Sequence, residues 1–145
     1  MVVVIIALRI ISKRMQKREI ILQINESMQF SFVKYMKKIY GIFDIENQKK
    51  EFPMRFIDFF VTLVYFRNTK RDIYIPNKEK LKIIKIIQSD HKIIRNLSKL
   101  YLKSYHEYFD IAYDSCDEKF IKEDAGHMVV GYMMHIISKY EDSLT

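Results

Sequence analysis

The chain has 145 residues, of which 49% are hydrophobic and 30% are charged, a balance that excludes intrinsic disorder for the chain as a whole. Its length predicts a single domain over residues 1–145 with a substantial core. Only three glycines and two prolines punctuate the sequence, which disfavours a turn-rich all-β fold. The one cysteine, Cys116, excludes an internal disulfide and predicts a reducing, cytoplasmic location with the thiol buried or half-buried.

The net charge of +7 is unevenly distributed. Residues 1–100 carry 21 basic and 9 acidic side chains, a net charge of +12, whereas residues 101–145 carry 4 basic and 9 acidic ones, a net charge of −5. A basic half can contact a polyanion or form lysine-rich solvated faces. The apolar run at residues 2–8 is broken by Arg9 and is shorter than the ~20 residues that a membrane-spanning helix needs. We therefore expect no membrane segment.

Apolar residues recur with helical spacing from residue 17 onward. One amphipathic helix is predicted over residues 17–40, and Gly41 is placed to terminate it. The polar residues 44–51 are expected to form a linker, after which Pro53 opens the next helix near its first turn. That helix, which continues to Phe66, is apolar on most sides, so we expect it at the centre of the domain.

A break at residues 67–77 is expected to separate this central helix from a short helix over residues 78–88. Asn77 is the expected N-cap of the short helix. Residues 89–90 are expected to cap the start of a long helix over residues 91–115.

Residues 114–119 are expected to form a polar turn ahead of the last helix, which is predicted over residues 122–140. The acidic pair 123–124 would lie in its first turn, where negative charge complements the helix dipole. Gly126 and Gly131 would lie inside this helix. Because each glycine costs about 1 kcal/mol relative to alanine there, the pair predicts a close backbone approach by a neighbouring helix.

The chain contains the residue types that metal sites and active sites use, but their spacing matches none of the corresponding motifs. His127 and His135 fall in the last predicted helix, but no HxxxH or HExxH pair exists. The chain has no glycine-rich phosphate loop and no GxSxG context for a serine nucleophile. We therefore expect no metal, no cofactor and no enzymatic activity.

The segment over residues 90–140 resembles the C-terminal part of tetracycline-repressor-like (TetR family) transcriptional regulators. Three stretches carry the resemblance: LSKLYLKSY at 97–105, FIKED at 120–124 and AGHMVVGYMMHII at 125–137. In addition, KREIIL at 17–22 resembles the segment that closes the family's DNA-binding domain.

This resemblance implies an all-α fold, a bundle of about six helices like the TetR-family C-terminal regulatory domain. It implies a domain over residues 17–145 that senses a ligand and forms a homodimer through its last two helices, which pair with those of a second copy. Residues 1–16 are too few for the family's helix-turn-helix and show no recognition helix, so they are expected to be a remnant or an atypical N-terminal segment. DNA binding would then need a helix-turn-helix supplied elsewhere.

Aromatic side chains supply the candidate pocket for a small apolar or cationic ligand. The pocket candidates are Phe59, Phe60, Tyr101 and Tyr105. The candidates for the dimer interface are Phe109, Met128, Tyr132, Met133, Ile136 and Ile137. Tyr105 also suits a position near that interface.

Two alternatives remain open at this point. One is a small helical protein-interaction module, like a Bcl-2 bundle that receives an amphipathic helix in a groove. The other is charge-driven binding of nucleic acid, through the basic residues between Arg9 and Arg18 or the basic, aromatic stretch at residues 65–74.

Overall fold

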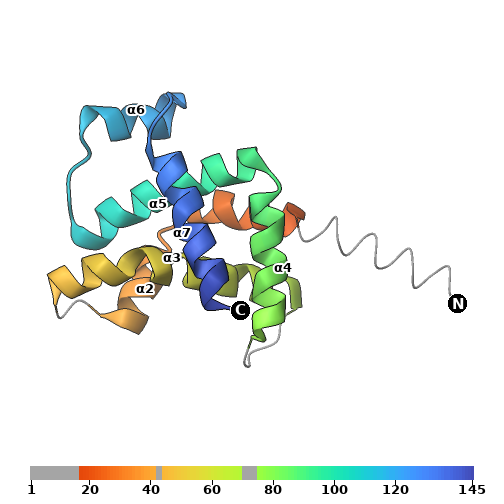
Figure 1. Ribbon diagram of the computed structural model, residues 1–145. Helices are drawn as coiled ribbons and strands as arrows, with labels where there is room; N and C mark the ends of the chain where they lie inside the picture. The colour runs from red at the N-terminus through yellow and green to blue at the C-terminus, as the bar shows by residue number, and fades with distance from the viewer. Residues whose placement is uncertain (1–16, 42–43, 70–74) are drawn as a thin grey trace, which may run out of the picture.

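The computed structural model describes residues 17–41, 44–69 and 75–145, and within these ranges the chain contains helices and no strand (Figure 1). This confirms the all-α prediction. None of the helices in these ranges is both long and apolar enough to cross a membrane. Residues 1–16, expected to form an atypical N-terminal segment, lie outside the description. A helix over residues 17–29 is followed by α2 (Val33–Tyr40), α3 (Ile45–Thr69), α4 (Asn77–Gln88), α5 (His91–Phe109), α6 (Ser115–Glu123) and α7 (Val129–Ser143).

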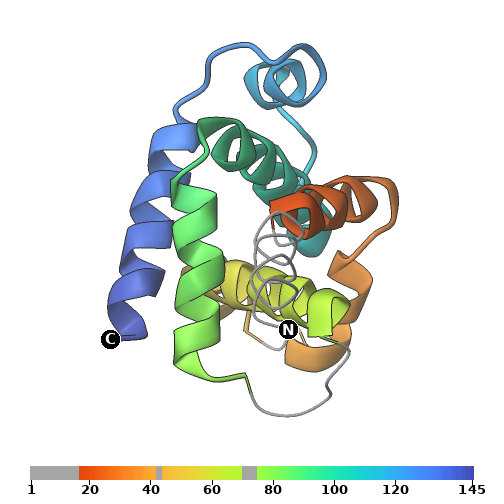
Figure 2. The ribbon, with the colours of Figure 1, turned by 90° about the vertical axis from the view of Figure 1, so that its right-hand side faces the viewer.

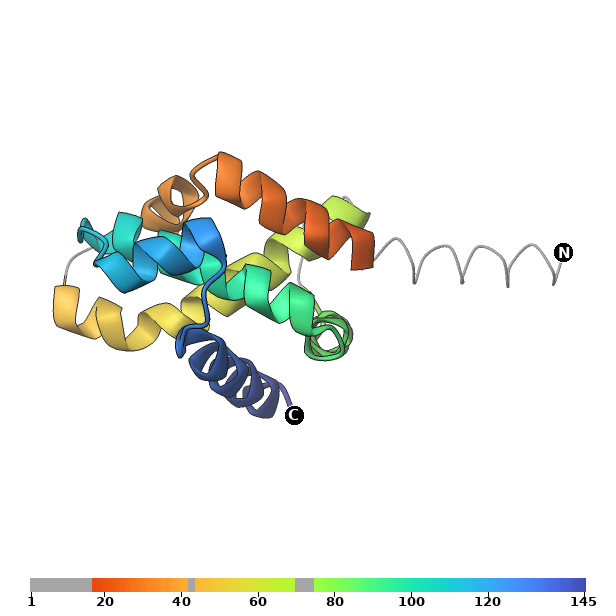
Figure 3. The same ribbon diagram turned by 90° about the horizontal axis from the view of Figure 1, so that it is seen from above.

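The helices pack in layers around α3 and α5. Seen from above, helix 17–29 lies on one side of α3 and α5, and α7 lies on the other (Figure 3). α7 contacts α3, α4 and α5, so it covers the open side of the core. α6 packs on α5 and stands at one end of the molecule (Figure 2).

An aromatic cluster joins α3 to α5 in the core. Its centre is Phe52, which is almost fully buried. The rings around it, with centroids 5.1 to 6.2 Å away, are those of Phe56, Tyr101, Tyr105, Tyr108 and Phe109. Edge and tilted contacts at such distances are favourable for aromatic pairs, so this cluster fixes how the two helices meet.

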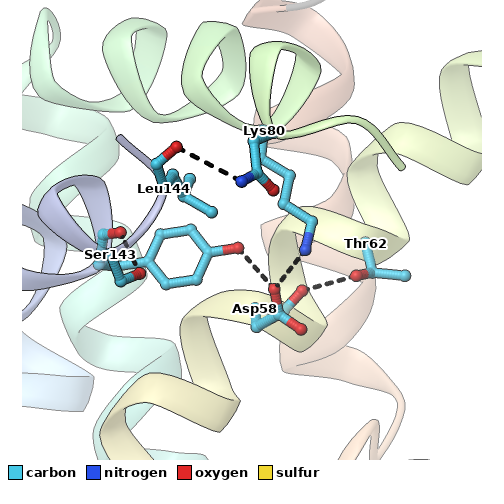
Figure 4. Close-up of polar contacts among 7 residues, drawn as sticks. Asp58, Thr62, Lys80, Ser143 and Leu144 are labelled. Atoms are coloured by element: carbon cyan, nitrogen blue, oxygen red, sulfur yellow. Dashed lines mark hydrogen bonds and ion pairs between the residues drawn. The ribbon is translucent and has the colours of Figure 1, made fainter. Parts of the chain in front are cut away.

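A polar tie joins α3, α4 and α7 (Figure 4). The carboxylate of Asp58 accepts hydrogen bonds from Lys80 Nζ at 3.0 Å and from the Tyr140 hydroxyl at 2.6 Å. Thr62 donates to the Asp58 carbonyl oxygen, and Ser143 donates to the Tyr140 carbonyl oxygen. Burial and, after it, the bond to Asp58 raise the pKa of the Tyr140 hydroxyl, so Tyr140 remains a donor.

Residues 17–40 form two helices, so the prediction of a single helix is wrong. A turn at residues 30–32 separates helix 17–29 from α2. The turn places the buried Phe32 ring 5.7 Å from Phe56 and 5.6 Å from Phe59. Burying this ring against α3 accounts for the break. The predicted end at Gly41 is confirmed, because Gly41 has a φ of 69° and its N–H closes α2.

The prediction of a linker at residues 44–51 is also wrong, because α3 already begins there. The Asp44 side chain accepts a hydrogen bond from the Asn47 N–H at 3.3 Å and so caps this start. Pro53 consequently lies inside α3 rather than in its first turn. A proline there removes one helical hydrogen bond, which is a destabilising change. The buried Phe52 holds this part of α3 against α5, and that packing offsets the loss.

The boundaries around α4 differ in detail from expectation. Asn77 is the first residue of α4, and Pro76 holds the N-cap position without a side-chain hydrogen bond. The Asn77 amide donates instead to the Leu144 carbonyl oxygen at 3.4 Å. Ser89 ends α4. The predicted cap at Asp90 is confirmed, because its carboxylate accepts from two backbone amides of α5 at 3.0 and 3.2 Å.

The predicted helix over residues 91–115 and the polar turn at residues 114–119 are both corrected. α5 ends at Phe109, where Asp110 takes a left-handed backbone with a φ of 52°. Asp114 then caps α6 by accepting a hydrogen bond from the Asp117 N–H at 2.7 Å. This cap turns a stretch that looks like a polar turn into a helix.

The last helix also begins later than predicted. Asp124, with a φ of 60°, terminates α6, so the acidic pair 123–124 closes one helix instead of opening the next. Gly126 lies outside any helix, and only Gly131 lies within α7. A Cβ added at either glycine would meet no atom within 4 Å. The predicted close approach of a neighbouring backbone is therefore wrong.

Cys116 is exposed, which contradicts the predicted buried or half-buried thiol. The cause is the position of α6 at the edge of the molecule, where Phe120 is its only fully buried side chain.

Candidate functional site

A cavity of about 730 Å³ opens between α5 and the start of α7. Its size is typical of sites for small organic molecules. α5 contributes Tyr101 and Tyr105, α7 contributes Tyr132, and α3 contributes Lys49. α6 and the segment between α6 and α7 complete the wall.

Three tyrosines form the aromatic part of this wall. Tyr101 and Tyr105 stack on successive turns of α5 with ring centroids 6.2 Å apart. Tyr132 meets Tyr101 edge-on at 6.0 Å. Burial raises the pKa of the Tyr101 hydroxyl, and the nearby Tyr132, through its charge and a hydrogen bond, raises it further. Tyr101 therefore stays protonated, and the three rings offer flat, largely apolar surfaces to a ligand.

A histidine bridge, made by His106, Asp117 and His127, forms the polar part of the wall. One carboxylate oxygen of Asp117 lies 3.3 Å from His106 Nε2, and the other lies 3.0 Å from His127 Nε2. The bridge thus connects α5, α6 and the segment that leads into α7.

Both ring nitrogens of each bridge histidine are occupied. His127 Nδ1 accepts a hydrogen bond from the Val129 N–H at 3.1 Å, and its Nε2 lies 3.0 Å from one carboxylate oxygen of Asp117. His106 Nδ1 lies 3.0 Å from the Ile111 carbonyl oxygen, and its Nε2 faces Asp117. Each of the four ring nitrogens therefore already faces a protein atom.

α6 is held in place on α5 by two further contacts. Lys99 Nζ lies 5.9 Å from the centre of the buried Phe120 ring. The Asp124 carboxylate pairs with Lys99 at 3.0 Å and with Arg95 at 3.2 Å. Hydrogen bonds from Lys99, and secondarily from Arg95, lower the pKa of the Asp124 carboxyl. These contacts hold Asp117 at the cavity.

The structure brings together only part of the predicted pocket. Tyr101 and Tyr105 line the cavity. Phe59 and Phe60 are buried in the core and do not line it. They lie about two turns along α3 from Phe52, the residue that meets Tyr101 and Tyr105. The prediction placed all four aromatic residues on facing helices, but it did not determine their positions along the helix axes.

The predicted interface residues do not share one surface. Met128 and Tyr132 are exposed, and both line the cavity mouth. Phe109 is partly buried against the core. The remaining three are buried by the chain's own helices, and they are Met133, Ile136 and Ile137. A second copy cannot reach these three side chains in this conformation.

The sequence did not indicate Lys49, His106, Asp117 or His127 as site residues. The three members of the bridge belong to different elements, and their spacing matches no motif. His127 drew attention only as a possible metal ligand with His135. Within the described residues, no group of three or more histidine, cysteine or acidic side chains is placed to hold a metal ion.

Of the basic residues singled out for nucleic-acid contact, Lys17 and Arg67 form ion pairs, whereas Arg18 is exposed and forms none among the described residues. Arg67 pairs with Glu19 and Glu26 of helix 17–29, and the hydrogen bond that it donates to Glu26 is the main cause of its raised pKa. Lys17 pairs with Asp90. The rest of the basic loop, residues 70–74, lies outside the description.

Exposed apolar side chains bear on the protein-interaction alternative. Phe30, Tyr35 and Ile39, at or next to α2, are 71%, 62% and 64% exposed. None of the three lines the cavity at α5 and α7.

The structure also differs from what the resemblance implied for the last two helices. A helix, α6, stands between α5 and α7 where a short turn was implied. Comparison of the chain with protein-family models, with curated proteins and with solved structures finds no match. The tetracycline-repressor-like assignment therefore stays a prediction.

Proposed function

We propose that this chain is a ligand-sensing domain that binds a flat, mainly apolar small molecule, in the manner of a TetR-like regulatory and dimerisation domain. The observation that carries the proposal is the open cavity walled by Tyr101, Tyr105 and Tyr132. Aromatic walls with a few fixed polar groups are the usual composition of sites that recognise small molecules.

Ligand binding in this cavity would regulate the protein by changing how the helices that line it are arranged. The cavity wall takes residues from α3, α5, α6 and α7. A ligand that contacts all four binds most tightly when they are held in one arrangement, and it shifts the population towards that arrangement. The exposed Met128 and Tyr132 lie at the same mouth, so a ligand would also alter a surface available to a second copy of the chain.

A binding role suits the site better than catalysis. A general acid or base needs a group within reach of the substrate that can accept or release a proton. The nitrogens of His106 and His127 are engaged with protein oxygens or a backbone amide. The bridge therefore acts as a fixed piece of wall.

Titration with 2-naphthol, a neutral flat aromatic probe, followed by amide NMR tests this proposal. We expect saturable shifts at α5 and the start of α7. Tyr132→Ala should weaken binding by about two- to tenfold, the equivalent of one aromatic contact of about 0.5–1.5 kcal/mol. The matched control is Met134→Ala, because Met134 has similar exposure on the same helix and does not line the cavity. Absence of saturable binding, or an equal loss in both variants, contradicts the proposal.

A further inference from the structure

Lys49 is the charged group at the cavity that has no opposite charge beside it. Its side chain is half-buried, and its Nζ lies 6.0 Å from the centre of the Phe109 ring. Among the described residues, no carboxylate forms an ion pair with it. A half-buried ammonium group without a neighbouring negative charge is a favourable binding site for an anion.

The one carboxylate in the cavity wall is, in contrast, fully engaged. Asp117 is largely buried, and each of its oxygens faces a histidine nitrogen, at 3.3 Å for His106 and at 3.0 Å for His127. A ligand cation would have to displace one of these histidine contacts to reach the carboxylate. The ammonium of Lys49, in contrast, has no charged partner to displace and is open to a ligand anion.

The hydroxyl groups of the tyrosine wall add one available donor. Tyr101 is buried, and its ring meets that of Tyr132 edge-on at 6.0 Å. Tyr105, half-buried in the same wall, has no hydrogen-bond partner for its hydroxyl within the described residues. The cavity thus combines flat aromatic surfaces with an ammonium and a hydroxyl that can both donate to an oxyanion.

We propose that the molecule this cavity takes is a planar aromatic carboxylate, with its ring on the tyrosine wall and its negative charge paired with Lys49. This inference rests on the proposed function and makes it more specific. It replaces the apolar or cationic ligand expected from the sequence. Aromatic rings alone suit a cation as well, and the arrangement of charges decides between the two.

The test compares three probes of the same shape on the full chain: 2-naphthoate, 2-naphthamide and 2-naphthylmethylammonium. We expect 2-naphthoate to bind about tenfold more tightly than the amide, near the lower end of what a hydrogen bond to a charged group contributes. The ammonium probe should bind most weakly. Lys49→Gln should abolish the preference for the carboxylate, and Lys49→Arg should keep most of it.

Lys50→Gln is the matched control, because it removes the same charge from the neighbouring exposed position, which does not line this cavity. Circular dichroism should show unchanged helicity in all variants. The inference is overturned if the ammonium probe binds as tightly as the carboxylate, or if Lys49→Gln keeps the preference. Equal binding of carboxylate and amide overturns the inference and leaves the proposed function standing. No binding of any probe overturns both.

Discussion

At the scale of single residues, burial controls the chemistry of the tyrosines. Desolvation is the main cause of the raised pKa at five of the ten, which are Tyr40, Tyr101, Tyr108, Tyr113 and Tyr140. A buried phenolate has lost its water and gains no cation strong enough to replace it. These hydroxyls therefore stay protonated, and two of them remain donors: Tyr108 to the Gly41 carbonyl oxygen at 2.7 Å and Tyr140 to the Asp58 carboxylate at 2.6 Å.

The first prediction is a loss of stability in alkali. Because the folded pKa of these tyrosines lies above the unfolded value of 10.0, their contribution is complete below pH 10 and is lost as the pH rises further. Absorbance titration of tyrosinate should show a group of tyrosines that ionises only as helicity disappears by circular dichroism. Ionisation of all tyrosines near pH 10 with helicity intact would contradict this prediction.

At the scale of the elements, helix ends decide the path of the chain. Gly41, Asp110 and Asp124 end α2, α5 and α6 with left-handed or otherwise positive φ angles. Side-chain caps at Asp90 and Asp114 begin α5 and α6. These local bonds create α6, and α6 carries Asp117 to the cavity.

The second prediction compares two glycines. Gly131→Ala should stabilise the protein by up to about 1 kcal/mol, because alanine is the better helix former and its methyl group meets no neighbour. Gly41→Ala should destabilise it by about 1–3 kcal/mol, because the φ of 69° strains any residue with a Cβ. Urea unfolding measures both changes. Loss of stability with Gly131→Ala would indicate a close neighbour that the described residues do not supply.

At the scale of the whole molecule, α7 both packs on the core and borders the cavity. Met133, Ile136 and Ile137 are buried in the core, whereas Tyr132 and the preceding Met128 lie beside that buried face and are exposed at the cavity mouth. Since the buried residues of α7 are already packed within the protomer, any pairing of copies through this helix must use its exposed residues. Pairing that covers Met128 and Tyr132 would bury the cavity mouth and, on the proposed function, would link dimerisation to ligand binding.

The third prediction concerns that pairing. Light scattering after size exclusion should give a mass of twice the 17.6 kDa chain. Met128→Asp should raise the dissociation constant of the dimer by about tenfold or more, because it brings an unpaired charge into the contact. Tyr35→Asp, on the exposed face of α2, is the control and should leave the mass unchanged. A monomer at all concentrations, or a dimer sensitive only to Tyr35→Asp, contradicts pairing through α7.

Three features could be predicted without the structure: the all-α class, the end of α2 at Gly41 and the cap at Asp90. These features depend on a residue and its near neighbours in the chain, so periodicity and capping chemistry predict them. The sequence also indicated Tyr101 and Tyr105, since both lie on the inner face of a long amphipathic helix.

Three other features arise from packing between helices: the turn at residues 30–32, the cavity and the histidine bridge. The helix is interrupted at Phe32 because the ring of this residue is buried against the aromatic rings of α3. His127 contacts Asp117 because α6 folds back onto α5. Such contacts join residues that are distant in the chain or held apart by caps. Their free energy is available only after the helices have packed, which is why periodicity, a purely local signal, does not predict them.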